Sequence, residues 1–327
     1  MVIVAVILGT WAGVFMSAFM YGLSMQYIRS ELVNFTSNIQ IHTKAYNIEP
    51  MPEYFIPEAD SIIQVLEQKA YVMEVTSRTK VSGLASSSSS TFGVTIRGID
   101  PDREKKVTQL YTFMKEGDYF EESRRNQIIV GEKLANRLNQ KMRSKVVLNF
   151  QDVDGNISAA AFRVSGIFKS PNSMFDESNV FVRSSDLSRL IGHPGAVHEI
   201  ALLVDNFKNA PTYAKELSFG DALEVQSWSD LSPALAYTDS MVGTMLYIVM
   251  TIILIALTFG IINTMLMTVL ERQQELGMLM AVGVNKIRTF SMILSETFFL
   301  AIFGAPFGVF LAWVGITLLE DKGINVS

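Results

Sequence analysis

The sequence predicts a membrane protein, an α-helical transmembrane bundle that is interrupted by a folded aqueous domain of mixed α and β structure. Hydrophobic residues make up 49% of the chain and charged residues only 18%, with a mean hydropathy of +0.27. This composition is too apolar for an ordinary soluble protein. The apolar excess is concentrated near the two ends, whereas residues 29–240 carry most of the charge. The chain therefore contains membrane segments on both sides of one water-exposed domain.

Three apolar stretches are long enough to cross a bilayer. Residues 2–27 and 241–270 contain no charged residue, and residues 290–319 contain only Glu296. About 20 predominantly apolar residues span a hydrocarbon core of roughly 30 Å. We therefore predict transmembrane helices over residues 1–28, 240–270 and 289–319.

The first stretch has one alternative interpretation, a cleaved signal peptide. It lacks a basic amino-terminal region, is longer than a typical signal-peptide core and has no clear small-x-small cleavage site, so a retained helix is favoured. The third stretch is followed by residues 320–327, which we predict to start an external loop. Because three spans are an odd number, we expect a fourth helix beyond this sequence.

Basic residues near the helix ends predict the orientation of the chain. The short connection over residues 271–288 holds Arg272, Lys286 and Arg288. Short loops rich in Lys and Arg stay on the cytoplasmic side of the membrane. The large domain, residues 29–239, is then expected outside the cytoplasm.

Within that domain, β-branched runs alternate with amphipathic stretches, a pattern typical of an α+β fold. Residues 152–156 read Asp-Val-Asp-Gly-Asn and predict a tight hairpin turn, and the serine run 86–90 predicts a flexible loop. Strands are predicted over residues 72–81, 91–99, 128–130, 145–150, 160–168, 179–182, 199–204 and 223–228, and helices over 61–69, 132–138, 184–191 and 210–217.

Several classes of function are excluded or disfavoured by composition. The absence of cysteine excludes a disulfide framework and thiolate metal sites. His42, His193 and His198 show no metal-ligand spacing with nearby acids, so we predict no metal site. The net charge of −5 disfavours nucleic-acid binding, which is typically accompanied by an excess of basic residues.

The connection between the second and third spans carries a specific motif. It reads Glu271-Arg-Gln-Gln-Glu-Leu-Gly-Met-Leu-Met-Ala-Val-Gly283, followed by Asn285-Lys-Ile-Arg288 and Ser295-Glu-Thr-Phe298. This resembles the ER-x-x-E-[IL]-G…A-x-G…E signature of the FtsX/MacB superfamily of ABC transporter permeases. In the outer domain, Val130-Gly-Glu-Lys-Leu-Ala135 and Phe162-Arg-Val-Ser-Gly-Ile-Phe168 are similar to motifs of the periplasmic core domain of that family. The resemblance covers essentially the whole chain.

Shorter motifs are similar to the lipoprotein-releasing (LolC/LolE-like) branch of this superfamily. They are Arg97-Gly-Ile-Asp-Pro101, Glu116-Gly-Asp-Tyr-Phe120, and Phe175-Asp176 before Asn179-Val-Phe-Val182. In some lipoprotein-releasing subunits the hairpin before the second core-domain motif is extended into a hook for a periplasmic chaperone. The tight turn at residues 152–156 counts against chaperone capture by this chain.

The resemblance implies a set of partners and a location. It implies a bacterial inner-membrane protein with four transmembrane helices and a periplasmic domain between the first two. It further implies an ABC ATPase subunit, a second permease copy or paralogue, a lipoprotein or amphipathic cargo, contact with membrane lipids, and a periplasmic chaperone or adaptor.

The chain lacks the G-x-x-x-x-G-K-[ST] loop whose backbone amides hold nucleotide phosphates. ATP and Mg²⁺ are therefore expected on a separate ATPase subunit, with no cofactor and no catalytic residue on this chain. The segment Glu271 to Met280 is our candidate for the helix that contacts that subunit, the alternative being an interfacial amphipathic turn. Its candidate contacts are an apolar ridge of Leu276, Leu279 and Met280, a polar rim of Glu271, Arg272 and Glu275, and Gly277 and Gly283 for close approach and chain reversal.

Glu296 is the single charged residue of the third span. An unpaired carboxylate in a membrane costs several kcal/mol unless it pairs, protonates or reaches water. We predict that it pairs with Arg272 or Arg288 and anchors the cytoplasmic loop to the third span. The alternative is that its side chain reaches the membrane interface without a partner.

The first span carries small residues at four-residue intervals, a pattern that permits close helix packing. These are Gly9, Gly13 and Ser17, and we expect a second permease copy as their partner. A pliable apolar wall for acyl chains is predicted nearby, the alternative being lipid-facing packing. Its residues are Phe15, Met16, Met241 and Met245.

The leading hypothesis is that ATPase motion moves the coupling helix, and that the outer domains then expel lipoproteins from the inner membrane toward the outer membrane. Two alternatives use the same machinery. One is MacB-like efflux of toxins, antibiotics or peptides, and the other is an FtsX-like scaffold that transmits motion and transports nothing.

Overall fold

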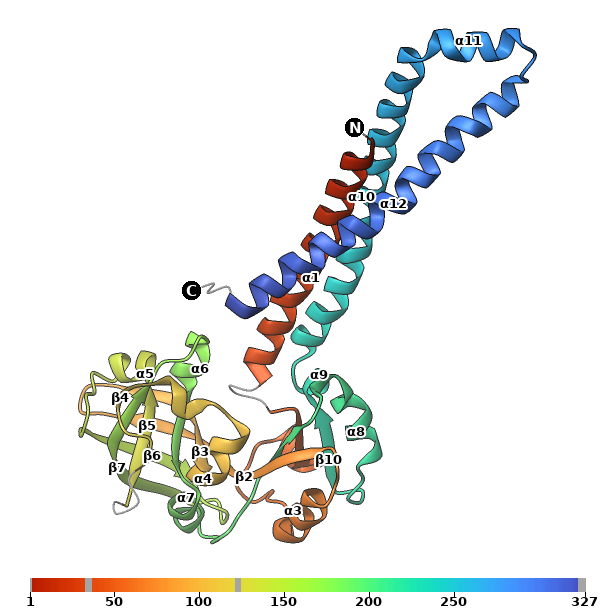
Figure 1. The fold of residues 1–327 in the computed structure, drawn as a ribbon. Helices are drawn as coiled ribbons and strands as arrows, with labels where there is room; N and C mark the ends of the chain where they lie inside the picture. The colour runs from red at the N-terminus through yellow and green to blue at the C-terminus, as the bar shows by residue number, and fades with distance from the viewer. Residues whose placement is uncertain (1, 33–36, 121–124, 323–327) are drawn as a thin grey trace. The chain divides into compact units, whose positions relative to one another are not determined.

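The computed structural model describes residues 2–32, 37–120 and 125–322, and the chain divides into two compact units (Figure 1). The first, here called the helical unit, comprises Met1–Ile28 and Tyr237–Ser327. The second, here called the globular unit, comprises Arg29–Ala236.

The helical unit contains α1 (Val2–Glu31), α10 (Pro233–Glu271), α11 (Gln273–Ala281) and α12 (Lys286–Lys322). In α1, α10 and α12, the stretches Ile3–Ile28, Pro233–Glu271 and Lys286–Leu319 are long and apolar enough to cross a membrane. Helix α10 starts before the predicted residue 240, because Pro233 suits the first turn of a helix. Helix α12 extends into the segment predicted as an external loop, and residues 323–327 lie outside the described residues.

Small residues determine how the helices of the helical unit pack. A Cβ atom on Gly9 would overlap the side chain of Leu257, and one on Gly13 would lie 3.1 Å from Cγ2 of Ile253. Both glycines therefore face α10 of the same chain. Contact of this small-residue face with a second permease copy stays a prediction.

A second small-residue stripe lies on α12. Gly304, Gly308 and Ala312 are spaced four residues apart and are buried. A Cβ atom on Gly308 would lie 2.7 Å from the carbonyl oxygen of Ile7 and 2.8 Å from Cβ of Thr10. Helix α1 is thus in close contact with α10 on one side and with α12 on another, by the small-xxx-small packing common between membrane helices.

The globular unit has the alternating strands and helices that the sequence predicts. Its strands are β1 (Ile39–Thr43), β2 (Val72–Ser86), β3 (Thr91–Ile99), β4 (Met114–Gly117), β5 (Gln127–Gly131), β6 (Lys145–Gln151), β7 (Ile157–Phe168), β8 (Asn179–Arg183), β9 (Glu199–Val204) and β10 (Leu223–Ser227). Its helices are α2 (Lys44–Ile48), α3 (Ala59–Glu67), α4 (Pro101–Val107), η2 (Leu110–Phe113), α5 (Glu132–Arg137), α6 (Ser173–Ser178), α7 (Ser184–Leu190), η3 (Phe207–Asn209), α8 (Ala210–Glu216) and α9 (Trp228–Leu231).

Six of the strands form a closed barrel. Each pairs with the next in the order β2, β3, β8, β5, β7, β6, and β6 pairs back with β2. The interior is apolar and includes Ile96, Val146 and Phe162, with Leu134 of α5 and Leu187 of α7 in the same cluster. Closure needs a close backbone approach at Gly83 of β2, where a Cβ atom would lie 2.6 Å from the carbonyl oxygen of Asn149.

Strand β2 also belongs to a second sheet, of order β10, β1, β9, β2. Its first half, Val72–Arg78, pairs with β9, and its second half, Arg78–Ser86, pairs with β3. We call the region around Arg78 the sheet junction, since Arg78 faces Glu199 of β9 on one side and Ile99 of β3 on the other.

The hairpin turn predicted over residues 152–156 is present, whereas the serine run 86–90 differs from its prediction. Between β6 and β7, Oδ1 of Asp152 accepts hydrogen bonds from the amides of Asp154 and Asn156, at 3.0 and 2.8 Å. The serine run forms an ordered turn rather than a flexible loop, because Oγ of Ser87 accepts from the amides of Ser89 and Ser90.

Candidate coupling site

Helix α11 is a short helix set off from the long helices on both sides. It begins after Arg272, whose backbone leaves the helical region at φ −103° and ψ 20°. It ends at Gly283, which has φ +100°, a conformation that favours glycine. The amide of Val284 donates to the carbonyl of Leu279 and that of Gly283 to Met280, both at 3.1 Å, the pattern of a Schellman C-cap. The predicted chain reversal at Gly283 therefore has this cap as its structural basis.

The surface of α11 is open and apolar. Met278 is 65% exposed, and Leu279 and Met280 are also exposed, whereas Leu276 is only partly so. A Cβ atom on Gly277 would meet nothing within 4 Å. Met278 was not predicted, because it lies off the i, i+3, i+4 stripe that starts at Leu276. The apolar surface extends to Val282, which is 86% exposed, so the ridge is broader than predicted.

The polar residues of the site lie close to this surface. Nη1 of Arg272 lies 3.7 Å from Oε1 of Glu296, and both side chains are about half exposed. The structure therefore pairs Glu296 with one of the two predicted arginines. Glu271, the last residue of α10, and Glu275, in the first turn of α11, are both exposed.

The residues of the predicted apolar wall do not form one surface. Phe15 and Met16 of α1 line a groove of about 630 Å³ against α10, together with Gly9 and Gly13. Phe15 is stacked between Trp11 and Phe19, with ring centroids 5.8 and 6.3 Å apart. Ser17 follows on α1, and its Oγ is buried with no hydrogen-bond partner among the described residues.

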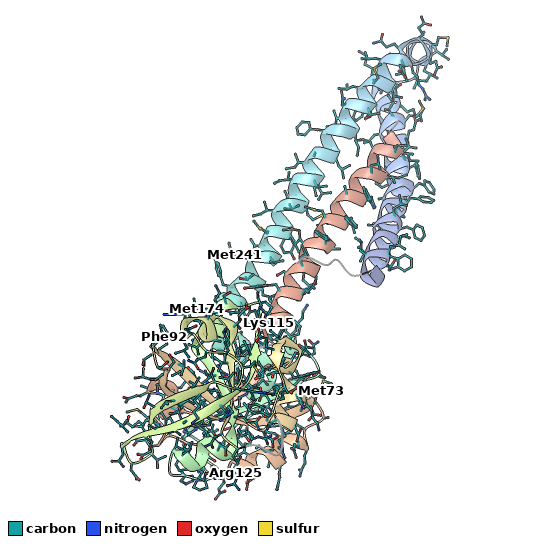
Figure 2. All side chains as sticks on the ribbon, turned by 90° about the vertical axis from the view of Figure 1, so that its left-hand side faces the viewer. Met73, Phe92, Lys115, Arg125, Met174 and Met241 are labelled. Carbon is teal, nitrogen blue, oxygen red and sulfur yellow. The ribbon has the colours of Figure 1, made fainter. Side chains whose placement is uncertain are left out.

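The two methionines of α10 lie outside this groove. Met241 and Met245 are 49% and 57% exposed, and Figure 2 shows Met241 on α10. The sequence could not separate the two pairs of residues, because helical spacing alone does not tell which side of α10 meets α1.

The sheet junction of the globular unit holds a buried network of charges. Arg78 is 1% exposed and donates to both oxygens of Glu104, from Nη2 at 2.7 Å and from Nε at 3.0 Å. It also pairs with Glu199, whose other oxygen accepts from Nζ of Lys80 at 2.7 Å. Burial alone would raise the pKa of Glu199, but Lys80 and Arg78 hold it well below its usual value.

Two of the three histidines are buried beside this network. Nε2 of His198 lies 2.9 Å from the carbonyl of Pro52, and its Nδ1 accepts from the amide of Lys80. Burial lowers the pKa of His198 to about 4 and also lowers that of His42. Among the described residues, no group of three or more His, Asp or Glu could hold a metal ion.

Comparison with known families assigns the class of the protein. The family model of the MacB-like periplasmic core domain matches residues 1–218, and that of the FtsX-like permease C-terminal region matches residues 247–327. The chain belongs to this permease family, as its motifs predicted. It is therefore a membrane-embedded ABC transporter permease with an extracytoplasmic domain, and membership implies an ATPase partner.

Individual relatives are distant. An uncharacterized ABC transporter permease of Methanocaldococcus jannaschii is 23% identical over 97% of this chain and 79% of its own length. The lipoprotein-releasing system transmembrane protein LolC of Neisseria meningitidis is 23% identical over 83% of this chain and 68% of its own. The macrolide export ATP-binding/permease protein MacB of Bdellovibrio bacteriovorus is 32% identical, over 34% of this chain and 17% of its own.

One solved structure, the periplasmic region of MacB from Actinobacillus actinomycetemcomitans, is 16% identical. It covers 65% of this chain and 97% of its own length, with a TM-score of 0.43.

Proposed function

We propose that this permease transmits the motion of a separate ATPase subunit through α11 to its extracytoplasmic domain, and so releases lipoproteins from the bacterial inner membrane toward the outer membrane. The observation that carries the proposal is the open apolar surface of α11, around Met278, Leu279 and Met280. Exposed apolar side chains beside an unobstructed glycine are suited to the groove of a partner protein. ATP and Mg²⁺ bind to the partner, and this chain contributes no cofactor site.

The ion pair between Arg272 and Glu296 is the proposed link from α11 to α12. It joins the residue that precedes α11 to a residue inside α12. Movement of α11 is then carried into α12 without bending the loop at Gly283. Two permease chains, identical or paralogous, act together, and Met241 and Met245 are available to cargo acyl chains or to lipid.

A second candidate function is efflux of small molecules or peptides. It is favoured by the relatives themselves, since proteins named for macrolide export match this chain as well as a lipoprotein-releasing protein does. A periplasmic chaperone or adaptor belongs to both proposals. The tight turn at Asp152 offers a chaperone no extended hook, so chaperone capture falls to the second permease chain.

The coupling step is tested with the double variant Leu279→Asp/Met280→Asp, purified with its native ATPase. Two buried apolar contacts exchanged for carboxylates should weaken association at least about 100-fold, since each such contact contributes on the order of 1.5–3 kcal/mol. The matched control is Ile48→Asp/Met174→Asp, which adds the same charges at exposed positions of the globular unit. Equal association of both variants would contradict the role of α11.

The cargo is tested by mass spectrometry of the purified complex and by ATP turnover in proteoliposomes. Triacylated lipoproteins that copurify and change ATP turnover would support lipoprotein release. Turnover that responds to macrolides or peptides and not to lipoproteins would instead support efflux.

A further inference from the structure

The globular unit carries a second site that the proposed function does not use. It is a pocket of about 340 Å³ beside the start of β5, lined by Arg125, Arg143 and Arg163 together with Asp118. We call it the basic pocket. Figure 2 shows Arg125 at the surface of the globular unit.

Main-chain hydrogen bonds hold the three arginines in one place, although they come from three segments of the chain. The amide of Arg163 in β7 donates to the carbonyl of Asn126 at 2.8 Å. The amide of Arg143, in the turn before β6, donates to the carbonyl of Val164 at 2.9 Å. The backbones around the basic pocket are therefore fixed before any ligand arrives.

In the part of the chain that the structure describes, the positive charge of the basic pocket is not balanced by carboxylates. Among the described residues, none of its three guanidinium groups makes an ion pair or a side-chain hydrogen bond, and Asp118 is its one carboxylate. Other arginines of the globular unit do pair, such as Arg137 with Glu177 and Arg189 with Asp186. This excess of positive charge occurs in a chain whose net charge is −5.

The sheet register adds a further cation. Lys145 of β6 is directly opposite Arg163 of β7. Like charges in facing positions of an antiparallel pair are destabilising. No ion pair among the residues that the structure describes relieves this cost to folding, as is expected where the charges serve a ligand.

We propose that the basic pocket binds the phosphate group of a ligand. Guanidinium groups bind the oxygens of phosphate in a two-pronged geometry, and an excess of two positive charges matches a doubly charged phosphate. The excess of two counts the residues that line the pocket, three arginines and Asp118, and leaves out Lys145, which lies beside it. The volume suits one or two phosphate groups rather than a folded partner. The phosphate belongs either to a soluble compound or to a lipid headgroup. This site is independent of the route that the cargo takes.

The test measures binding of inorganic pyrophosphate to the permease chain without its ATPase, whose own phosphate-binding loop would also bind the probe, in zwitterionic nanodiscs by calorimetry at 0.15 M salt. We expect saturable binding that Arg143→Gln and Arg163→Gln each weaken by about 10-fold or more, since a bond to a charged group contributes that much. Asp118→Asn should strengthen binding, because it removes the one opposing charge.

The matched control is Arg103→Gln, at an exposed arginine of α4 outside the basic pocket. Absence of saturable binding, or an equal loss of affinity in Arg103→Gln, would overturn the proposal. Arg143→Lys and Arg163→Lys keep the positive charge and control for misfolding of the glutamine variants. They should weaken binding less than Arg143→Gln and Arg163→Gln do. If pyrophosphate binds more weakly in nanodiscs that contain phosphatidylglycerol, the lipid headgroup competes for the pocket and is the source of the phosphate group. If binding is unchanged, the phosphate group belongs to a soluble ligand.

Discussion

The sheet junction and helix α11 differ in whether the chain itself completes their contacts. At the junction, Arg78 is almost fully buried and its guanidinium bonds to two carboxylates of the same chain. On α11, Met278 is 65% exposed and Gly277 has no neighbour within 4 Å of a Cβ atom. The sheet junction, whose buried polar groups are hydrogen-bonded within the chain, contributes to stability. Helix α11, whose apolar side chains are exposed, is available to bind a partner. The two regions should therefore respond to mutation in different assays.

The largest effect on stability is expected at the junction. Arg78→Met leaves Glu104 and Glu199 buried without their main partner, and breaking a buried pair in this way costs about 3–5 kcal/mol. Thermal or denaturant unfolding of the full chain would measure the loss. The control is Arg103→Met, which removes an exposed pair with Glu67 and should cost less than about 1 kcal/mol. Equal losses in both variants would remove the distinction between the two regions.

The second-largest effect on stability is expected from acid, which should weaken the sheet junction. His198 is neutral in the folded protein with a pKa of about 4, whereas an unfolded histidine titrates near 6.5. The unfolded chain then binds more protons between these values, so stability should fall as the pH drops from about 6.5 to 4, by up to about 3 kcal/mol. Glu199 adds to the loss as the pH falls toward 4.5, because an unfolded glutamate then binds protons whereas the folded one, with a pKa held well below this value, does not.

The measurement is the pH dependence of unfolding in the wild type and in His198→Gln, which keeps a donor for the carbonyl of Pro52. The variant should show a shallower slope between pH 6.5 and 4. An identical slope would show that His198 does not titrate as its burial requires.

A smaller effect is expected at the end of α11. Gly283→Ala places a side chain at φ +100° and should cost about 1–2 kcal/mol, as local loosening of the turn. Hydrogen exchange of the α11 amides would report it. Gly277→Ala is the informative partner variant, because it lies in open space and should stabilise the helix by roughly 0.5–1 kcal/mol. If Gly277 lies against the ATPase, the same variant should weaken ATPase association while the helix gains stability.

The smallest effect on stability is expected for Glu296→Gln. Its pair with Arg272 is half exposed, and such pairs contribute less than about 1 kcal/mol. ATP-driven transport should nevertheless fall if the pair joins α11 to α12. A double-mutant cycle with Arg272→Gln separates the pair from each residue alone. Unchanged transport in Glu296→Gln would favour the alternative that this carboxylate only reaches the membrane interface.

The sequence predicts the parts of this protein that depend on local pattern. The three apolar helices, the hairpin turn at Asp152 and the motif around α11 are all read from adjacent residues. Glu296 could be predicted as a site residue because it is the single charge in an apolar stretch. Its two predicted partners, Arg272 and Arg288, lie in the adjoining loop. These features need no knowledge of distant contacts.

Features that depend on distant pairing were not predictable in this way. Closure of the barrel by β6 on β2 joins segments far apart in the sequence, and no local pattern specifies it. Gly304 and Gly308 pack against α1, and Gly9 packs against α10, but spacing alone does not tell which helix each of them meets. The basic pocket joins arginines at positions 125, 143 and 163, which only the fold brings together.

Strand β2 has one more consequence, because it is shared by the barrel and the open sheet. It has 15 residues and is about 50 Å long at a rise of about 3.3 Å per residue. Neither sheet can rotate against the other without twisting this strand and separating the charges around Arg78. We therefore expect the barrel and the second sheet to move together as one rigid body, rather than about a hinge between them.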